Sequence, residues 1–316
     1  MTKLKNSTLR PPDYINKITP YIPGKPIEEL QRELGISNCI KLASNENPLG
    51  PSPLAIKEMQ TALVGLNRYP DGGAYSLKAA LSRFYGVDAQ EIVIGHGSNE
   101  LLDVAVRTFM PATQDNIHEC IMADPSFIVY YNSTVKAAGT AVKVPLTDDY
   151  RHDLPAMLAR INDKTRIVFI ANPNNPTGTI VRAEEFDTFM RGLPDNVLVV
   201  VDEAYYEYVT DKVYPDSMRY FREGCPILIL RTFSKIYGLA GLRIGYGIAN
   251  RAIVGEMDKV REPFNTGSAS QAAAIGALKD TEHVSKSVAV NETGKAYLFE
   301  GERKGLVEGQ RKGLVE

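Results

Sequence analysis

The sequence predicts an α/β protein whose core is a mostly parallel sheet of seven strands, with helices packed on both faces. Two observations support this. Seven apolar runs rich in Val and Ile alternate with stretches of helix length such as 99–110, 183–191 and 216–222. The runs are apolar at successive positions, as in parallel strands that are buried on both faces. They are EIVIG (91–95), ECIMA (119–123), AVKVPL (141–146), RIVFIA (166–171), NVLVVV (196–201), PILIL (226–230) and LRIGYGIA (242–249).

Two Pro-rich segments precede these strands. Prolines 11, 12, 20, 23 and 26 come first, NENPLGPSP (45–53) comes second, and a short helical stretch at 27–34 lies between them. We expect an arm followed by a hinge.

Charge and cysteine content narrow the class of partner. The 36 basic and 38 acidic residues leave a net charge of −2, too little positive charge to hold nucleic acid or an anionic membrane. A small-molecule partner is therefore expected. Cys39, Cys120 and Cys225 form no C-x-x-C motif, and no apolar run approaches the ~18 residues of a spanning helix. The N-terminus has no signal-peptide core, so we expect a cytoplasmic protein.

Chemically active side chains follow five of the predicted strands. Because ligands of parallel sheets bind at the carboxyl ends of the strands, these segments are expected to form one site. They contribute a helix start, an aromatic ring, an Asn/Thr turn, a carboxylate with a tyrosine, and a lysine. The segments are HGSNE, DPSF, NPNNPTG, DEAYYE and RTFSK.

Lys235 is the candidate nucleophile of this site. A lone lysine after a strand is usually a solvated surface residue. Near other cations and partly desolvated, its pKa falls, and the neutral amine can form an imine with an aldehyde. Pyridoxal phosphate is the obvious aldehyde.

Asp202 has two possible roles. An apolar strand that ends in Asp-Glu also occurs in NTPases that bind magnesium, but the chain has no G-x-x-x-x-G-K-[ST] loop. A carboxylate at the bottom of a cofactor pocket can instead keep a pyridine nitrogen protonated, which makes the ring an electron sink. Asp202 fits that second role.

A phosphate group could bind where Gly97 and Ser98 start a helix, since backbone N–H groups are free there. Arg243 is either a structural ion-pair partner or, near Ser234, part of a phosphate cage. Other chemistries lack their motifs. Glu100 occupies the third glycine position of G-x-G-x-x-G, no G-x-S-x-G occurs, and Ser234-Lys235 is not part of an S-x-x-K motif. The four histidines have no spacing that predicts a metal site.

With Lys235, Asp202, Asn175 and Arg243 in this order, the chain resembles the fold type I aminotransferases that use pyridoxal phosphate. The motifs NPNNPTG, DEAY and S-K…G-L-R-x-G carry the resemblance. PYIPGKPIEELQRELG, KLASNENPLGPSP and NRYPDGGAYSLKAAL make it most similar to the histidinol-phosphate aminotransferases. That resemblance implies transfer of an amino group from histidinol phosphate to 2-oxoglutarate in histidine biosynthesis, giving imidazole-acetol phosphate and glutamate.

The resemblance also implies a role for each site residue. Lys235 would bind the cofactor and move protons, Asp202 would hold the pyridine nitrogen, and Tyr205 and Asn175 would contact the ring oxygen. Tyr69 would reach the phosphate from the neighbouring subunit of a homodimer, whose site lies at the interface. The remaining residues are phosphate contacts (Gly97, Ser98, Asn99, Ser234, Arg243), a ring contact (Phe127) and substrate contacts (Tyr21, Asn47).

The C-terminus departs from the family pattern. We expect residues 1–45 to form an arm and part of a small domain, 46–256 a large domain that binds pyridoxal phosphate, and 257–316 an incomplete small domain. The chain ends in the near-identical units GERKGLVE and GQRKGLVE, which a truncation or a sequence error explains more readily than design. Their Arg303 and Arg311 do not match the arginines with which the family grips its substrate. Three functions remain open: the transaminase above, a threonine-phosphate decarboxylase or aromatic aminotransferase, and a catalytically silent chain that binds the cofactor.

Overall fold

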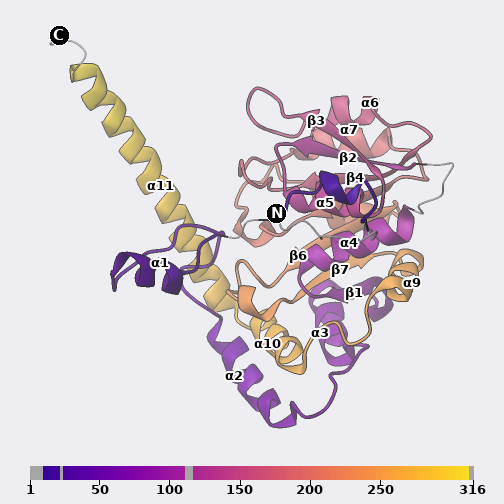
Figure 1. Cartoon of the computed structure of the whole chain (residues 1–316), viewed down its shortest axis with the longest axis horizontal. Coiled ribbons are helices and arrows are strands. Elements are labelled where there is room, and N and C mark those ends of the chain that lie inside the picture. Colours follow the sequence, from indigo (N-terminus) through magenta and orange to yellow (C-terminus); the bar gives the residue numbers. More distant parts are fainter. Residues whose placement is uncertain (1–9, 22–23, 111–116, 313–316) are drawn as a thin grey trace.

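The computed structural model describes residues 10–21, 24–110 and 117–312, with side chains up to residue 299. Pro23 of the predicted arm, the last four residues of the repeated units and the side chains of Arg303 and Arg311 therefore lie outside the described part. Figure 1 shows helices packed around one central sheet, from which the last helix extends away. Among the described helices, none is both long and apolar enough to cross a bilayer.

All seven predicted strands are present and form a single sheet in the order β1-β7-β6-β5-β4-β2-β3. Only β7 runs against its neighbours, and the other four pairings are parallel. The prediction of a mostly parallel, seven-stranded sheet is confirmed. The strands are β1 (Ile92–Gly95), β2 (Glu119–Asp124), β3 (Thr140–Pro145), β4 (Thr165–Ala171), β5 (Leu198–Asp202), β6 (Ile227–Thr232) and β7 (Gly245–Ala249).

Helices cover both faces of this sheet, as the continuous apolar strands predicted. Along β5, Val199 and Val201 belong to one core cluster, whereas Leu198 and Val200 belong to another. Successive side chains of a strand point to opposite faces, so both faces of β5 are buried. The helices are α1 (Ile27–Leu34), α2 (Pro53–Ala62), α3 (Tyr75–Tyr85), α4 (Ser98–Phe109), α5 (Ile128–Lys136), α6 (Leu154–Ala159), α7 (Ala183–Arg191), α8 (Ser217–Arg222), α9 (Arg251–Val260), α10 (Ser268–Leu278) and α11 (Thr281–Lys312).

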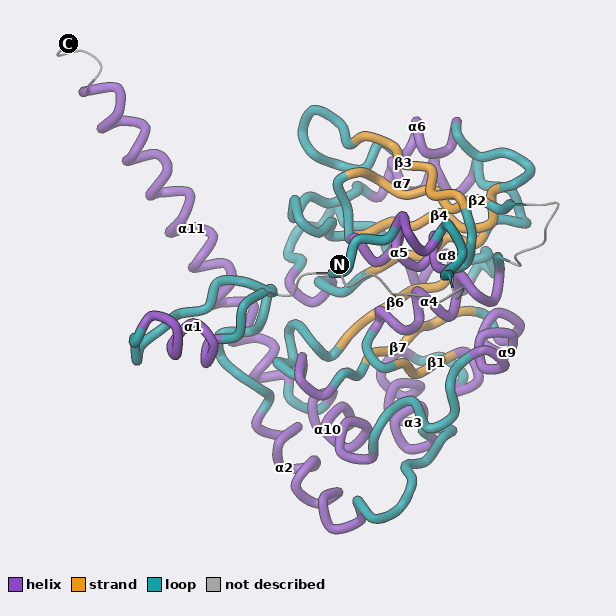
Figure 2. The backbone as a smooth tube through the Cα atoms, in the orientation of Figure 1, coloured by secondary structure: helices purple, strands orange, loops and turns teal. Residues whose placement is uncertain are grey.

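The two clusters assign the helices to faces. Buried residues of α4, α5 and α9 join the cluster on one face, and those of α2, α3, α6, α7, α8 and α10 join the other. Figure 2 shows the loops that connect these helices to the strands. How the chain divides into domains stays a prediction.

One backbone crossing places the N-terminal segment beside the loop that follows β6. Gly238 has φ +68°, and a Cβ there would lie 2.0 Å from the carbonyl oxygen of Gly50. The Ser52 N–H donates to the carbonyl oxygen of Tyr237 at 3.1 Å. Only glycine permits this approach, which brings residues 44–52 next to the loop that carries Lys235.

Candidate functional site

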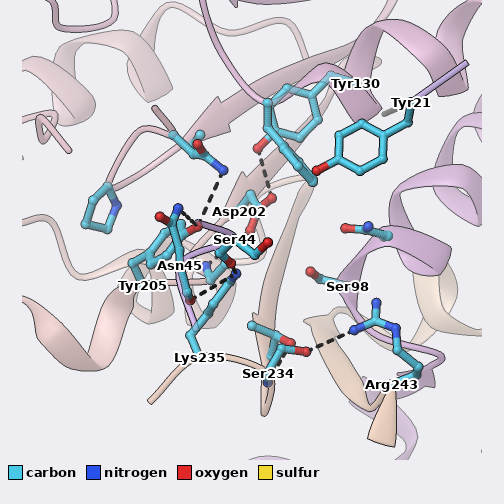
Figure 3. A pocket seen from close by; sticks show the side chains of 17 residues that line it. Tyr21, Ser44, Asn45, Ser98, Tyr130, Asp202, Tyr205, Ser234, Lys235 and Arg243 are labelled. Atoms are coloured by element: carbon cyan, nitrogen blue, oxygen red, sulfur yellow. Dashed lines mark hydrogen bonds between the residues drawn. The ribbon is translucent and has the colours of Figure 1, made fainter. Parts of the chain in front are cut away.

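A cavity of about 380 Å³ opens where β2, β4, β5 and β6 end (Figure 3). Its size falls within the range of roughly 300–1,000 Å³ that is typical of small-ligand pockets. The five segments that follow predicted strands all contribute to its lining, together with the N-terminal segment. The lining residues are Tyr21, Ser44, Asn45, Ser98, Asn99, Phe127, Tyr130, Ala171, Pro173, Asn175, Asp202, Ala204, Tyr205, Thr232, Ser234, Lys235 and Arg243.

Asp202, the last residue of β5, is the buried acid of this cavity. Its side chain is only 5% exposed. Tyr130 Oη donates to Oδ2 at 2.9 Å, and the Ala204 N–H donates to Oδ1 at 3.1 Å. Burial raises the pKa of Asp202 to about 6, although these two hydrogen bonds act in the opposite direction. The carboxylate is therefore ionised at neutral pH and would gain stability from a cation placed against it.

Lys235 lies in the loop after β6, with its amine held by two backbone carbonyls. Nζ donates to the carbonyl oxygen of Ser44 at 3.2 Å and to that of Asn45 at 3.4 Å. Both residues have positive φ, 72° for Ser44 and 50° for Asn45, a conformation that is uncommon outside glycine. Burial, followed by the charge of Arg243, lowers the pKa of Lys235. At a given pH, a larger fraction of the Lys235 amine is therefore neutral than in a lysine with an ordinary pKa.

Tyr205 is held by two amide side chains. Asn45 Nδ2 donates to its Oη at 3.0 Å, and Asn175 Nδ2 donates to the same oxygen at 3.4 Å. Burial raises the pKa of Tyr205, which keeps the phenol protonated. The Tyr205 ring centroid lies 5.5 Å from Lys235 Nζ, so hydroxyl, amides and amine form one polar group in the cavity.

The opposite part of the cavity has the donors that a phosphate requires. Ser98 starts α4, and Gly97 before it has φ +75° and makes no side-chain cap, which leaves the N–H groups of the first turn available. A Cβ on Gly97 would lie 2.6 Å from Arg243 Nη2, so the close guanidinium requires glycine here. Arg243 Nη1 donates to Ser234 Oγ at 3.3 Å. Two buried hydroxyls, a cation and a helix N-terminus fit a phosphate group.

The structure brings most predicted site residues together and leaves three outside the lining, namely Asn47, Tyr69 and Gly97. Asn47 Nδ2 donates to the carbonyl oxygen of Ile236 and to Ser287 Oγ, both at 2.8 Å. Tyr69 is 84% exposed and stacks on Phe264, with ring centroids 4.9 Å apart. Gly97 contacts the guanidinium of Arg243, which itself lines the cavity.

Sequence reasoning missed Tyr130, Ser44 and Asn45. A signal existed for Tyr130, which lies in the first turn of the helix that begins directly after Phe127. Their rings pack edge to face at 5.8 Å. No pattern distinguished Ser44 and Asn45, because their contacts are made with residues far along the chain. Both accept from Lys235 through backbone carbonyls, and Asn45 also donates its side-chain amide to Tyr205.

Comparisons with known proteins agree with this geometry. The family model described as aminotransferase class I and II matches residues 37–313. The histidinol-phosphate aminotransferase of Moorella thermoacetica is 51% identical over 286 residues, which cover 90% of this chain and 73% of that protein. Histidinol-phosphate aminotransferase 1 of Nitrosococcus oceani is 47% identical, with 90% and 75% covered.

A solved structure shows the same similarity. The histidinol-phosphate aminotransferase of Sinorhizobium meliloti, determined in complex with pyridoxal-5'-phosphate, superposes with a TM-score of 0.79 at 30% identity, covering 90% of this chain and 75% of that one. The chain therefore belongs to the class I and II aminotransferases and, within them, to the histidinol-phosphate aminotransferase family. The resemblance, the fold type and the aminotransferase class predicted from the motifs are thereby confirmed.

The buried carboxyl of Asp202 predicts a pH-dependent stability in the cofactor-free protein. Its pKa is about 6 in the folded chain against an ordinary 3.8, so the folded state binds more protons than the unfolded state between these values. The free energy of unfolding therefore falls as the pH rises through this window, by on the order of 3 kcal/mol. Asp202→Asn should remove this loss. Urea unfolding at several pH values measures this effect. From about pH 4 to about pH 7, the free energy of unfolding of the variant should rise relative to that of the parent protein.

Asp148→Asn, in an exposed loop, is the control. Its free energy of unfolding should differ from that of the parent protein by the same amount at every pH. A stability difference between Asp202→Asn and the parent that does not change with pH would contradict the prediction.

Proposed function

We propose that this chain is a pyridoxal phosphate-dependent aminotransferase that converts histidinol phosphate and 2-oxoglutarate to imidazole-acetol phosphate and glutamate. The observation that carries the proposal is the convergence of Lys235, Asp202 and Arg243 on one cavity at the ends of parallel strands. The identities of 51% and 47% with histidinol-phosphate aminotransferases support this amino donor over threonine phosphate or an aromatic amino acid.

Pyridoxal phosphate, when bound, supplies a conjugated ring that accepts the electron pair left when a bond to the substrate Cα breaks. Asp202 would keep the ring nitrogen protonated. Among the described residues its buried carboxylate accepts hydrogen bonds from neutral donors and not from a cationic side chain, so a protonated nitrogen would provide the missing positive charge. A cation there would lower the pKa of Asp202 below about 6 and keep it charged.

The remaining contacts would fix the ring and its phosphate. Ser98, Ser234 and Arg243 would donate to the phosphate oxygens at the start of α4, where Asn99 also lines the cavity. Phe127 would cover one face of the ring. The Tyr205 hydroxyl and the Asn175 amide, 3.4 Å apart, would both contact the ring hydroxyl.

Lys235 would act as the acid-base group. Because burial and Arg243 lower its pKa, Nζ spends more of its time as a neutral base that can take a proton from the substrate Cα. The carbonyls of Ser44 and Asn45 accept hydrogen bonds from the amine and so restrict its position. Tyr21, at the open side of the cavity, would contact the substrate, as would Asn47 from its place beside Ile236.

Two further features belong to the proposal. Residues 46–256 would form the cofactor-binding domain, flanked by the arm and the partial small domain. The enzyme would work in the cytoplasm, where the three free cysteines remain reduced.

We also propose a homodimer in which Tyr69 reaches the neighbouring site. Support comes from the segment just before Tyr69 in the sequence, where the apolar side chains of Leu63, Val64 and Leu66 are exposed. Exposed apolar surface is typical of protein interfaces.

Lys235 should be the residue that binds the cofactor covalently. Treatment of the holoenzyme with borohydride should attach the pyridoxyl group to the peptide that carries Lys235, and peptide mass spectrometry locates it. Lys41, whose amine pairs with Glu46 at 2.7 Å, is an internal control near the same segment and should stay unlabelled. Label on any other lysine would refute the assignment.

The amino donor can be determined by direct comparison. We expect turnover with histidinol phosphate to exceed that with threonine phosphate or phenylalanine by at least about tenfold in kcat/KM, a difference of about 1.4 kcal/mol in transition-state binding. Oxo-acid and carbon dioxide release should both be measured. Faster carbon dioxide release from threonine phosphate would favour the decarboxylase instead.

Subunit mixing tests the position of Tyr69. Tyr69→Phe and Lys235→Ala chains should each be weakly active or inactive, while their heterodimer has one site with both residues intact. Activity that reappears on mixing, together with subunit exchange seen by mass spectrometry, is the expected result. Full activity of Tyr69→Phe alone, or no recovery despite exchange, would contradict a shared site.

A further inference from the structure

Asn174, between the cofactor-pocket residues Pro173 and Asn175, does not line the cavity, yet its side chain links two loops that do. It is only 2% exposed. Nδ2 donates to Thr177 Oγ1 at 2.9 Å within its own loop and to the carbonyl oxygen of Pro125 at 3.3 Å in the turn after β2. Ser126 Oγ, in the same turn, donates to Asn174 Oδ1 at 2.8 Å.

The loop of Asn174 is already closed by its own backbone. The Asn174 N–H donates to the Thr179 carbonyl oxygen at 2.9 Å, and the Gly178 N–H donates to the Asn174 carbonyl oxygen at 2.8 Å. The side chain is therefore not needed to form the turn. Its bonds to Pro125 and Ser126 instead fix the distance between this loop and the turn after β2.

His152, from the segment between β3 and α6, supports the same amide. Its Nε2 lies 3.2 Å from Asn174 Oδ1, and the side chain is 6% exposed. Because Oδ1 can only accept, Nε2 must carry the hydrogen. Within the described chain, Nδ1 has no hydrogen-bond partner. Burial lowers the pKa of His152 to about 4, so the imidazole is a neutral donor at physiological pH.

We propose that Asn174 and His152 are positioning residues that hold Phe127, the contact to the face of the cofactor ring, in register with Asn175, the contact to the ring hydroxyl. Each of those two residues directly follows a residue in the hydrogen-bonded link, Ser126 for Phe127 and Asn174 for Asn175. A shift between the loops would move the aromatic contact and the ring-hydroxyl contact relative to each other. The inference rests on the proposed binding of pyridoxal phosphate.

Three substitutions test the link. His152→Leu removes the donor to Asn174, His152→Gln restores an N–H donor, and Ser126→Ala removes one hydrogen bond at a half-buried position. We expect His152→Leu and Ser126→Ala to weaken pyridoxal phosphate binding about three- to tenfold, the effect of one lost hydrogen bond. They should also change the visible circular dichroism of the bound cofactor, which depends on ring orientation. His152→Gln should recover most of both.

His118 provides a matched control. It is 8% exposed, its Nδ1 also has no partner among the described residues, and it precedes β2 at the end of the sheet away from the cavity. His118→Leu should lower the thermal unfolding temperature as His152→Leu does, because both replace a buried planar ring with a branched side chain that does not match the shape of its site. It should leave cofactor affinity and dichroism unchanged.

The outcomes separate this inference from the proposed function. If the parent protein and His118→Leu do not bind pyridoxal phosphate, the proposed function is wrong. If they bind it and both His152→Leu and Ser126→Ala match them in affinity and dichroism, the positioning role is wrong. An equal loss in His118→Leu would also overturn it, because the effect would then follow stability alone. Should His152→Leu fail to fold, Ser126→Ala against the parent protein decides the question.

Discussion

The site depends on keeping a carboxylate charged at the end of a strand that is buried on both faces. Every residue of β5 is buried, and Asp202 ends it in an environment that favours the neutral acid. Two donors counter this effect: a phenol from the first turns of α5 and a backbone N–H from the loop that leaves β5. α5 and that loop thus supply the hydrogen bonds that this buried carboxylate accepts.

Glu203, the acid next to Asp202 in the sequence, differs from it because it forms a buried ion pair. Glu203 follows Asp202 directly, so its side chain leaves the cavity and enters the core, where Arg231 Nη2 lies 2.8 Å from its Oε2. The Arg231 guanidinium also lies 3.6 Å from the ring centroid of Tyr206. The charge of Glu203 raises the pKa of Asp202 less than burial does. The Asp-Glu pair that could have indicated a magnesium site is therefore split between two separate environments.

Periodicity and strand endings predicted the sheet and most of the cavity, because both follow from local sequence. Val- and Ile-rich runs define strands wherever they occur, and parallel strands bring their carboxyl ends to one edge whatever their order. What local sequence could not predict is contact across the chain. Residues 44–52 approach the Lys235 loop because Gly238 has no Cβ to collide with the Gly50 carbonyl, and Asn174 acts through partners in two other segments. Such contacts depend on packing and not on any pattern.

The separation of the lysine from the aspartate is as important as their presence in one cavity. Among the described ion pairs none joins Lys235 to Asp202, and the amine instead donates to two neutral carbonyls. A direct pair would raise the pKa of Lys235 and lower that of Asp202, leaving neither group available. The aldehyde carbon and the ring nitrogen of pyridoxal phosphate lie at opposite ends of its ring, so the roles proposed for these two groups require them to be apart. The backbone carbonyls that accept from the amine are compatible with that separation, while burial and the charge of Arg243 lower the pKa of Lys235.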